Sequence, residues 1–409
     1  MDRYGPIQRK GDIYMDKNRI FELYEPLHEE MAELSRYIYD NPELGNEEYK
    51  ACAAHVKFLR SHGFTVEENY LNIPTAFRAE YQGKKPGPTI CYLAEYDALP
   101  DIGHGCGHNL LGTVSSGAGV LLSKLVDEIG GRVVVGGTPA EETSGAKVAF
   151  AAQGAFDDVD VTLISHPYGD DIESGTSLAL DPIQFTFLGK PAHAAAAPEQ
   201  GINALDACLA TFHSINALRE HVLPTTRIHG IIKEGGVAAN IVPERAVAQF
   251  YVRTTSKAYL KEVVEKVENC ARAGALAAGA KLEITRFELG YDDLVTNHRL
   301  QAQLTKNLNA VGITDIQTSV EVAGSTDVGN VSHVCPTIHN NYSIFGPDEE
   351  GCPTHTVEFR EATLRPAALE AMRKNTCALV MTAADIIEDP QLLAEIKAEF
   401  EAATAAERK

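Results

Sequence analysis

Apolar segments of strand length alternate with helical segments along the first half of the chain, and this alternation restricts the fold more than any other feature. The strand-like runs are "TICYLAEYD", "GRVVVGGTPAEE" and "DVTLISHPYG". A small-residue helix pattern, "NLLGTVSSGAGVLLSKLVDEI", separates the first two. Such alternation is typical of an α/β fold, in which a mostly parallel sheet is flanked by helices.

Polar side chains follow each of these strand-like runs. Residues 94–108, 138–142 and 165–168 place acidic, histidine or cysteine side chains just after an apolar segment. In parallel sheets the ligand site lies off the carboxyl ends of the strands. The sequence therefore predicts that the three segments meet in one site.

The middle of the chain has a different pattern. Alternating strand-like segments and two amphipathic helices follow one another in the order β-α-β-β-α-β, the order of a small split βαβ sandwich. We expect residues 179–295 to form an inserted α+β, ferredoxin-like domain, and residues 1–178 with 296–409 to form the main domain. A chain of 409 residues is also longer than the domains that fold around a single hydrophobic core, so two domains are expected.

Charge and composition exclude several functional classes. The chain has 57 acidic against 36 basic residues and a net charge of −21, which argues against a nucleic-acid partner or an anionic membrane surface. No run approaches the ~20 apolar residues of a membrane span, and residues 1–20 lack the apolar core of a signal peptide. The eight cysteines are scattered without a close CxxC pair, which favours free thiols and a cytoplasmic location.

The segment "GHGCGHNLLG" places Cys106 and His108 two residues apart at a loop-to-helix junction. Thiolate and imidazole are preferred ligands of zinc and other first-row transition metals. The alternative interpretation is a buried cysteine beside a surface histidine in a glycine-rich loop. Taken alone, the pair favours this structural explanation.

Adjacent carboxylates and two further histidines favour the metal site. Glu141 and Glu142 follow a strand, and neighbouring carboxylates repel one another unless a cation neutralises them. One would bind metal while the other serves as the general base toward water. His166 ends another apolar strand and His355 lies in a turn. The alternatives are two solvated loop acids and ordinary rim histidines.

Six motifs in order carry a family resemblance: "YDALPDIGHGCGHN", "GTPAEE", "SHP", "GKPAHAAAAPEQGINALDA", "GGVAANIVPERA" and "GCPTHT". Together they resemble the metal-dependent aminoacylase and carboxypeptidase family, peptidase family M20 of clan MH. The Cys-Gly-His motif is similar to that of a branch with auxin-conjugate and aminobenzoyl-glutamate hydrolases. "CGHN" and "GSTDVGNVS" resemble a dipeptidase-like sub-branch, that of the peptidase M20 domain-containing protein 2.

The resemblance implies a role for each matching residue. It implies one or two divalent ions, zinc or manganese first, with cobalt or nickel also compatible. The implied metal ligands are Cys106, His108, Glu142, His166 and His355. Glu141 would be the general acid and base, and Asp97 would orient a ligand. In the inserted domain, His193 and Asn240 would stabilise the oxyanion or bind substrate, the histidine often reaching the site of a dimer partner.

Two departures from the family pattern limit what the resemblance transfers. Asn109 stands where the Cys-ligand branch commonly has an acid, in "HGCGHN" rather than "HACGHD". "GSTDVGNVS" replaces the usual acidic-aromatic stretch near the substrate pocket. The substrate preference of the auxin-conjugate enzymes is therefore not expected here.

The expected activity is hydrolysis of the amide bond of an N-acyl amino acid or dipeptide that carries a free carboxylate. Arg253 and Lys233 are candidate cationic anchors for that carboxylate. Two alternatives stay open: hydrolysis of N-carbamoyl or other ureido C–N bonds, and a metal-binding relative without activity. A homodimer through the inserted domain is implied by the resemblance alone.

Overall fold

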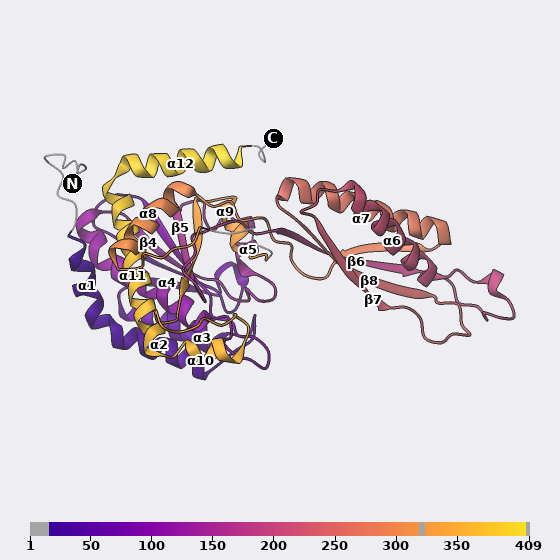
Figure 1. Cartoon of the computed structure of the whole chain (residues 1–409), viewed down its shortest axis with the longest axis horizontal. Helices are drawn as coiled ribbons and strands as arrows, with labels where there is room; N and C mark the ends of the chain where they lie inside the picture. The colour runs from indigo at the N-terminus through magenta and orange to yellow at the C-terminus, as the bar shows by residue number, and fades with distance from the viewer. Residues whose placement is uncertain (1–15, 319–323, 406–409) are drawn as a thin grey trace.

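The computed structural model describes residues 16–318 and 324–405, which form two parts joined by two chain crossings (Figure 1). The main domain carries both ends of the described chain, and the inserted domain extends away from it. Residues 1–15, most of the stretch used to argue against a signal peptide, lie outside the described residues.

A six-stranded sheet forms the centre of the main domain, in the order β1-β2-β4-β3-β5-β10. The strands are β1 (Thr65–Glu68), β2 (Phe77–Gln82), β3 (Thr89–Ala94), β4 (Arg132–Gly137), β5 (Val161–Tyr168) and β10 (Thr337–Ser343). The pairs β4–β3, β3–β5 and β5–β10 are parallel, whereas β1–β2 and β2–β4 are antiparallel. The predicted α/β class with a mostly parallel sheet is thereby confirmed.

Helices cover both faces of this sheet, so its central strands β3, β4 and β5 are buried on both sides, whereas the edge strand β1 is largely exposed. The larger core lies under α2 (His28–Asp40), α4 (His108–Ile129) and α11 (Pro366–Glu388). A smaller core lies under α5 (Ala146–Ala152) and α9 (Val328–Ser332). The remaining helices of the main domain are α1 (Asn18–Tyr24), α3 (Tyr49–Ser61), α8 (His298–Ala310), α10 (Val357–Ala362) and α12 (Pro390–Thr404).

Helix α4 packs unusually closely on the sheet. A Cβ atom added to Gly119 would lie 2.4 Å from Val135 Cγ2, so only glycine fits there. Contrary to the expectation that no run resembles a membrane span, α4 is long and apolar enough for one, with a mean hydropathy of 1.2. In the fold 94% of that stretch is buried, as in the core helix of a globular domain.

The inserted domain consists of a four-stranded antiparallel sheet and two long helices packed on one face (Figure 1). Its elements are β6 (Ala179–Leu188), α6 (Ala204–Leu218), β7 (Arg227–Glu234), β8 (Arg245–Thr254), α7 (Lys257–Ala278) and β9 (Lys281–Arg286). The strand order is β7-β8-β6-β9, so β7 is an edge strand. At the domain junction, Leu180 pairs with Tyr291 and brings the two crossings together.

Candidate functional site

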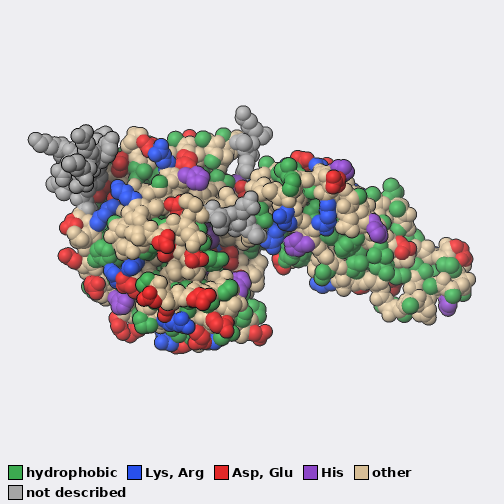
Figure 2. Space-filling model, viewed as in Figure 1, with side chains coloured by type: hydrophobic (Ala, Val, Ile, Leu, Met, Phe, Trp, Pro, Cys, Tyr) green, Lys and Arg blue, Asp and Glu red, His purple; other side chains and the backbone are tan. Residues whose placement is uncertain are grey.

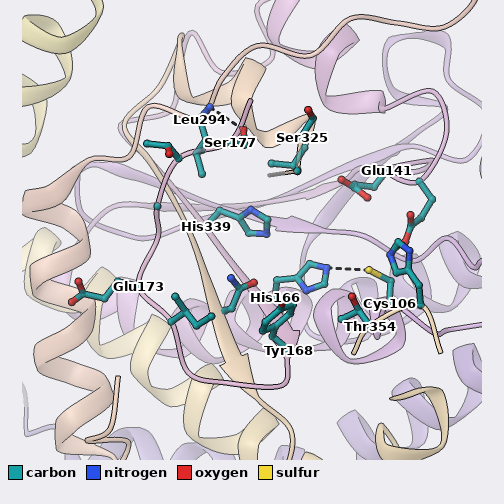
Figure 3. Close-up of a pocket in the computed structure, with 18 residues that line it drawn as sticks. Cys106, Glu141, His166, Tyr168, Glu173, Ser177, Leu294, Ser325, His339 and Thr354 are labelled. Atoms are coloured by element: carbon teal, nitrogen blue, oxygen red, sulfur yellow. Dashed lines mark hydrogen bonds and ion pairs between the residues drawn. The ribbon is translucent and has the colours of Figure 1, made fainter. Parts of the chain in front are cut away.

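A pocket of about 540 Å³ opens where β5 and β10 end, next to the loops that follow β3 and β4 (Figure 3). Cys106, Glu141, Glu142, His166 and His355 all line it. The strand-end segments singled out in the sequence therefore meet at one pocket, together with the turn that carries His355.

Glycine at position 107 lets Cys106 and His108 serve the same site. Gly107 has φ +79°, a left-handed conformation that suits glycine, and it directly precedes α4. A Cβ atom at this position would lie 2.6 Å from Pro167 Cγ. The turn therefore needs glycine both for its dihedral angle and for its contact with the residue after His166.

Asp97 fixes the orientation of His108. The Nδ1 atom of His108 lies 3.0 Å from both the carbonyl and a carboxylate oxygen of Asp97. Both oxygens are acceptors, so Nδ1 carries the proton and Nε2 is left to bind a metal. Asp97 also accepts a hydrogen bond at 3.0 Å from the backbone N–H of Glu142, which agrees with the orienting role predicted for it.

The donor atoms form two groups that share the thiol of Cys106. One group consists of Cys106, His108 and His166, and the other of Cys106, Glu142 and His355; within each group the atoms lie within 4.8 Å of one another. The Sγ of Cys106 lies 3.5 Å from His166 Nε2, and Glu142 Oε1 lies 3.3 Å from His355 Nε2. Donors on one tetrahedral zinc ion lie about 3.3–3.6 Å apart, given bond lengths of about 2.0–2.3 Å.

Unpaired buried atoms support the same interpretation. His108 Nε2 and Glu142 Oε1 are buried without a well-formed hydrogen bond to a described residue, and each has only an ion-pair contact at 3.3 Å, with Glu95 Oε2 and His355 Nε2 respectively. Buried polar atoms without partners are costly unless a ligand or ion satisfies them. The five residues thus fit one or two divalent ions, and Cys106 belongs to both donor groups.

Electrostatics at the centre follow from burial and close charges. Burial raises the pKa of the Cys106 thiol, and a bound cation would counter that effect. Burial also raises the pKa of Glu141, and the nearby carboxylates Glu95 and Asp327 add to the rise. For Glu142, burial is outweighed by the ion-pair contact with His355 and the charge of His108, which lower its pKa to about 2. The two neighbouring glutamates are therefore electrostatically distinct.

The loop that carries Glu141 and Glu142 is held from two sides. Ala140 has φ +62°, and its N–H donates to Glu48 Oε1 at 2.8 Å. The hydroxyl of Tyr291, at the domain junction, donates to the Glu141 carbonyl at 3.2 Å. Glu48 also accepts a hydrogen bond from Thr75 at 2.9 Å, and burial raises its pKa to about 7. Sequence analysis did not identify Glu48 or Tyr291, because both act through backbone contacts.

A fully buried charged cluster lies beneath the centre, and sequence analysis did not identify it either. The Nζ of Lys147 lies 2.7 Å from Glu95 Oε1 and 2.7 Å from Asp327 Oδ1. Glu95, His108 and Glu141 form a further group of potential donors within 4.8 Å. That group shares His108 with the first one and already holds the ammonium of Lys147 beside Glu95, so it is less suited to a separate ion. Glu95 could have been noticed in the sequence, because it directly follows the buried strand β3 in "AEYD".

A second residue not singled out in the sequence is His339 on β10. Its ring lies in the middle of the pocket in Figure 3, with its centroid 5.6 Å from that of His166. Burial lowers the pKa of His339 to about 3, and the neighbouring His166 acts in the same direction. Its position within the strand-like run "PTIHNNYS" gave no sign of a pocket residue.

The four residues predicted in the inserted domain do not meet in the pocket. Arg253 does not line the pocket itself, but its guanidinium donates at 3.3 Å to Ser325 Oγ, a residue that does. Lys233 lines a separate hollow on the inserted domain, beside His229 and Tyr251. His193 and Asn240 are exposed next to one another in that domain and do not line the pocket of their own chain. The roles predicted for these four residues stay predictions.

Comparison with known proteins decides the family. The chain is 36% identical to the Xaa-Arg dipeptidase of Mus musculus over 406 residues, which cover 95% of this chain and 93% of that protein. It is 32% identical to a p-aminobenzoyl-glutamate hydrolase component of Escherichia coli, over 69% of this chain and 62% of that protein. The chain belongs to the M20 peptidase family. Within it, residues 183–278 match the peptidase dimerisation domain.

Solved structures agree with the M20 fold. An aminobenzoyl-glutamate utilization protein from Klebsiella pneumoniae superposes with a TM-score of 0.69 at 19% identity, covering 89% of this chain and 98% of that one. A dinuclear metal-binding M20 peptidase from Bacillus subtilis superposes with a TM-score of 0.64 at 19% identity, covering 88% and 99%. At this identity the likeness shows the fold alone, and the M20 assignment depends on the sequence relatives.

Proposed function

We propose that this M20 protein hydrolyses the amide bond of dipeptides and N-acyl amino acids at a centre of two divalent ions. The observation that carries the proposal is the pair of donor groups that share Cys106, with Glu141 beside them. The named activities of the relatives support it: Xaa-Arg dipeptidase, p-aminobenzoyl-glutamate hydrolase and N-acetyl-L-cysteine deacetylase. Zinc or manganese is the first choice of metal, because thiolate, imidazole and carboxylate donors meet there.

In this proposal the two glutamates have separate tasks. Cys106, His108 and His166 would hold one ion, and Glu142 and His355 with Cys106 would hold the other. Bound divalent ions supply activation of water and polarisation of the amide carbonyl. Glu141 accepts a proton from the attacking water and then delivers it to the leaving amine. Asp97 keeps the His108 ring and the Glu142 backbone in place through its three hydrogen-bond contacts.

The pocket and the relatives together suggest a first substrate. Arg253 provides a guanidinium beside the pocket, which suits bidentate binding of the free carboxylate of the leaving residue. We propose dipeptides with a carboxyl-terminal basic residue, because two relatives are named Xaa-Arg dipeptidases. N-acyl and N-carbamoyl forms of the same amino acid are the comparisons that test amide against ureido hydrolysis.

The decisive experiment compares Glu141→Gln with Glu142→Gln. We expect Glu141→Gln to retain its metal and to lose ~100- to 10,000-fold in kcat, because positioned acid-base catalysis is removed. Glu142→Gln, one residue along the same loop, should instead lose metal from one of two positions. Metal content by mass spectrometry and turnover of alanylarginine are measured on both. Wild-type turnover in metal-loaded Glu141→Gln protein would refute the assignment.

We also propose a homodimer through the inserted domain and a cytoplasmic location. Residues 183–278 match a dimerisation domain, and hydrophobic side chains gather over the inserted domain (Figure 2). On its edge strand β7, Ile231 is 60% exposed. The eight cysteines are all unpaired, which suits a reducing compartment.

A further inference from the structure

His339 lines the pocket but has no role in the proposed mechanism. It lies on β10 two residues before Asn341, which pairs with His166 of β5 in the parallel register. Residues two apart on a strand point to the same face, so His339 and Asn341 both line the pocket beside His166. Figure 3 shows the His339 ring between the Cys106–His166 pair and the side of the pocket formed by Ser177 and Leu294.

The imidazole of His339 lacks a hydrogen-bond partner among the described residues. No hydrogen bond joins either ring nitrogen to another residue of the described chain, and Nε2 is buried. Buried polar atoms normally have a partner, and one left without a partner is costly. His166 itself is satisfied, since its Nδ1 donates to the Pro167 carbonyl at 2.7 Å. No described residue completes His339, so its ring nitrogen is available to a bound substrate.

The geometry of the pocket indicates which half of the substrate reaches His339. The scissile carbonyl belongs at the metal donors, and the carboxylate end belongs at Arg253 beside Ser325. The remaining arm of the pocket belongs to the main domain and is left for the acyl half. Its described lining residues include Tyr168, Ile172, Glu173, Ser177, Leu294 and His339.

Charge indicates what the acyl half carries. Among the described residues that line the pocket, the carboxylates are Glu141, Glu142 and Glu173, and there is no lysine or arginine. Two of these carboxylates belong to the catalytic centre, which leaves Glu173 as a negative charge on the acyl side. A positively charged group fits this arm better than a second carboxylate does.

We propose that His339 is a specificity residue that accepts a hydrogen bond from the free α-amino group of a dipeptide. The enzyme then prefers dipeptides over acyl amino acids that lack this amine. A neutral imidazole offers one acceptor nitrogen. This inference rests on the proposed amide hydrolysis, and it adds that the acyl half of the preferred substrate carries a free α-amino group.

The test uses two substrates that differ only in the amine: alanylarginine and N-propionylarginine. Metal-loaded wild-type enzyme, His339→Phe, His339→Gln and the pocket-rim control Thr176→Val are compared by kcat/KM. We expect His339→Phe to lose ~10- to 100-fold on alanylarginine, the range for a hydrogen bond to a charged group, and to change little on N-propionylarginine. His339→Gln, which keeps an acceptor, should retain more of the preference. Thr176→Val should leave it unchanged.

Two further measurements separate a specificity role from a structural one. Metal content and the visible absorption spectrum of the cobalt-substituted protein report on His166, and both should be unchanged in His339→Phe. A loss that is equal for both substrates, or no loss at all, overturns the inference while the amide hydrolase assignment stands. If wild-type enzyme cleaves neither substrate, the proposed function fails and this inference fails with it.

Discussion

At the scale of single residues, the buried cluster of Glu95, Lys147 and Asp327 is where the fold depends most on one charge. All three side chains are at most 1% exposed, and Lys147 is the cation that two carboxylates share. Removing one partner of a buried ion pair leaves an uncompensated charge, whereas neutralising the whole set is often tolerated. The cluster is therefore expected to matter for stability beyond any effect on turnover.

We predict that Lys147→Met lowers the free energy of unfolding by about 3–5 kcal/mol, measured by urea denaturation. The triple variant Glu95→Gln, Lys147→Met and Asp327→Asn should recover much of this loss, since no charge is then left unpaired. Lys266→Met is the surface control, because its partner Glu262 lies one turn away on α7 and both side chains are exposed. Equal effects of Lys147→Met and Lys266→Met would contradict the assignment.

Glu48 should give the protein a measurable pH dependence. Burial raises its pKa from an ordinary 4.5 to about 7. Between these values the unfolded chain has released the proton while the folded chain keeps it, so the free energy of unfolding falls as pH rises. Glutamine at position 48 cannot ionise, so the free energy of unfolding of Glu48→Gln lacks this contribution to the pH dependence.

From pH 5 to 7 we expect the stability of Glu48→Gln to rise relative to wild type by at most about 1.4 kcal/mol per pH unit. Chemical denaturation at several pH values measures it. The glutamine oxygen can still accept from Ala140, which keeps the loop in place as a control for lost contacts. Parallel stability curves for the two proteins would show that Glu48 does not titrate in this range.

At the scale of elements, the turn before α4 places the thiol of Cys106 in both of the proposed metal-donor groups. Gly107→Ala would bring a methyl group 2.6 Å from Pro167 Cγ, next to His166. We expect metal affinity to fall about 10- to 100-fold, the range for disturbed support of metal ligands. Gly279→Ala is the matched control.

Gly279 has a similar φ of +73°, but no atom lies within 4 Å of the added methyl group. The Gly279→Ala substitution should lower the free energy of unfolding by about 1 kcal/mol and leave metal affinity unchanged. Metal titration and denaturation of both variants separate the strain of the backbone from the crowding of the site. A Gly107→Ala protein with wild-type affinity would show that the turn tolerates the shift.

At the scale of the whole molecule, the exposed position of His193 connects activity to assembly. If His193 completes the site of a partner chain, Glu141→Gln and His193→Ala proteins are each inactive but complement one another. After equal mixing and subunit exchange, roughly half of the dimers contain one chain of each variant, and one of the two sites in each such dimer is complete. Roughly a quarter of all sites are then active. Activity of the mixture, with sedimentation to confirm dimers, is the measurement.

A histidine that acts within its own chain predicts no recovery in the mixture, because each chain then lacks one essential group. A variant of the edge strand, Ile231→Lys, provides the assembly control. It adds a charge to an exposed edge, as soluble proteins do to prevent pairing, and should produce monomers. Such monomers should lose turnover while they keep their metal.

The sequence by itself determined the class of fold and the family, and it predicted the set of side chains proposed to bind metal. Strand and helix periods are local properties, and the proposed ligands Cys106, His108 and Glu142 lie in short motifs, so both can be recognised without coordinates. Even the departure at Asn109 was visible, although only the structure shows its amide donating to Ser35 and Thr363 inside the core.

Tertiary structure alone decided which residues support the centre. Lys147 and Asp327 are 180 positions apart and meet only because α5 and α9 pack on the same face of the sheet. His339 joins the pocket through the register between β5 and β10, and a one-residue shift would turn it to the opposite face. These contacts depend on packing between distant segments, and no local pattern in the chain encodes them.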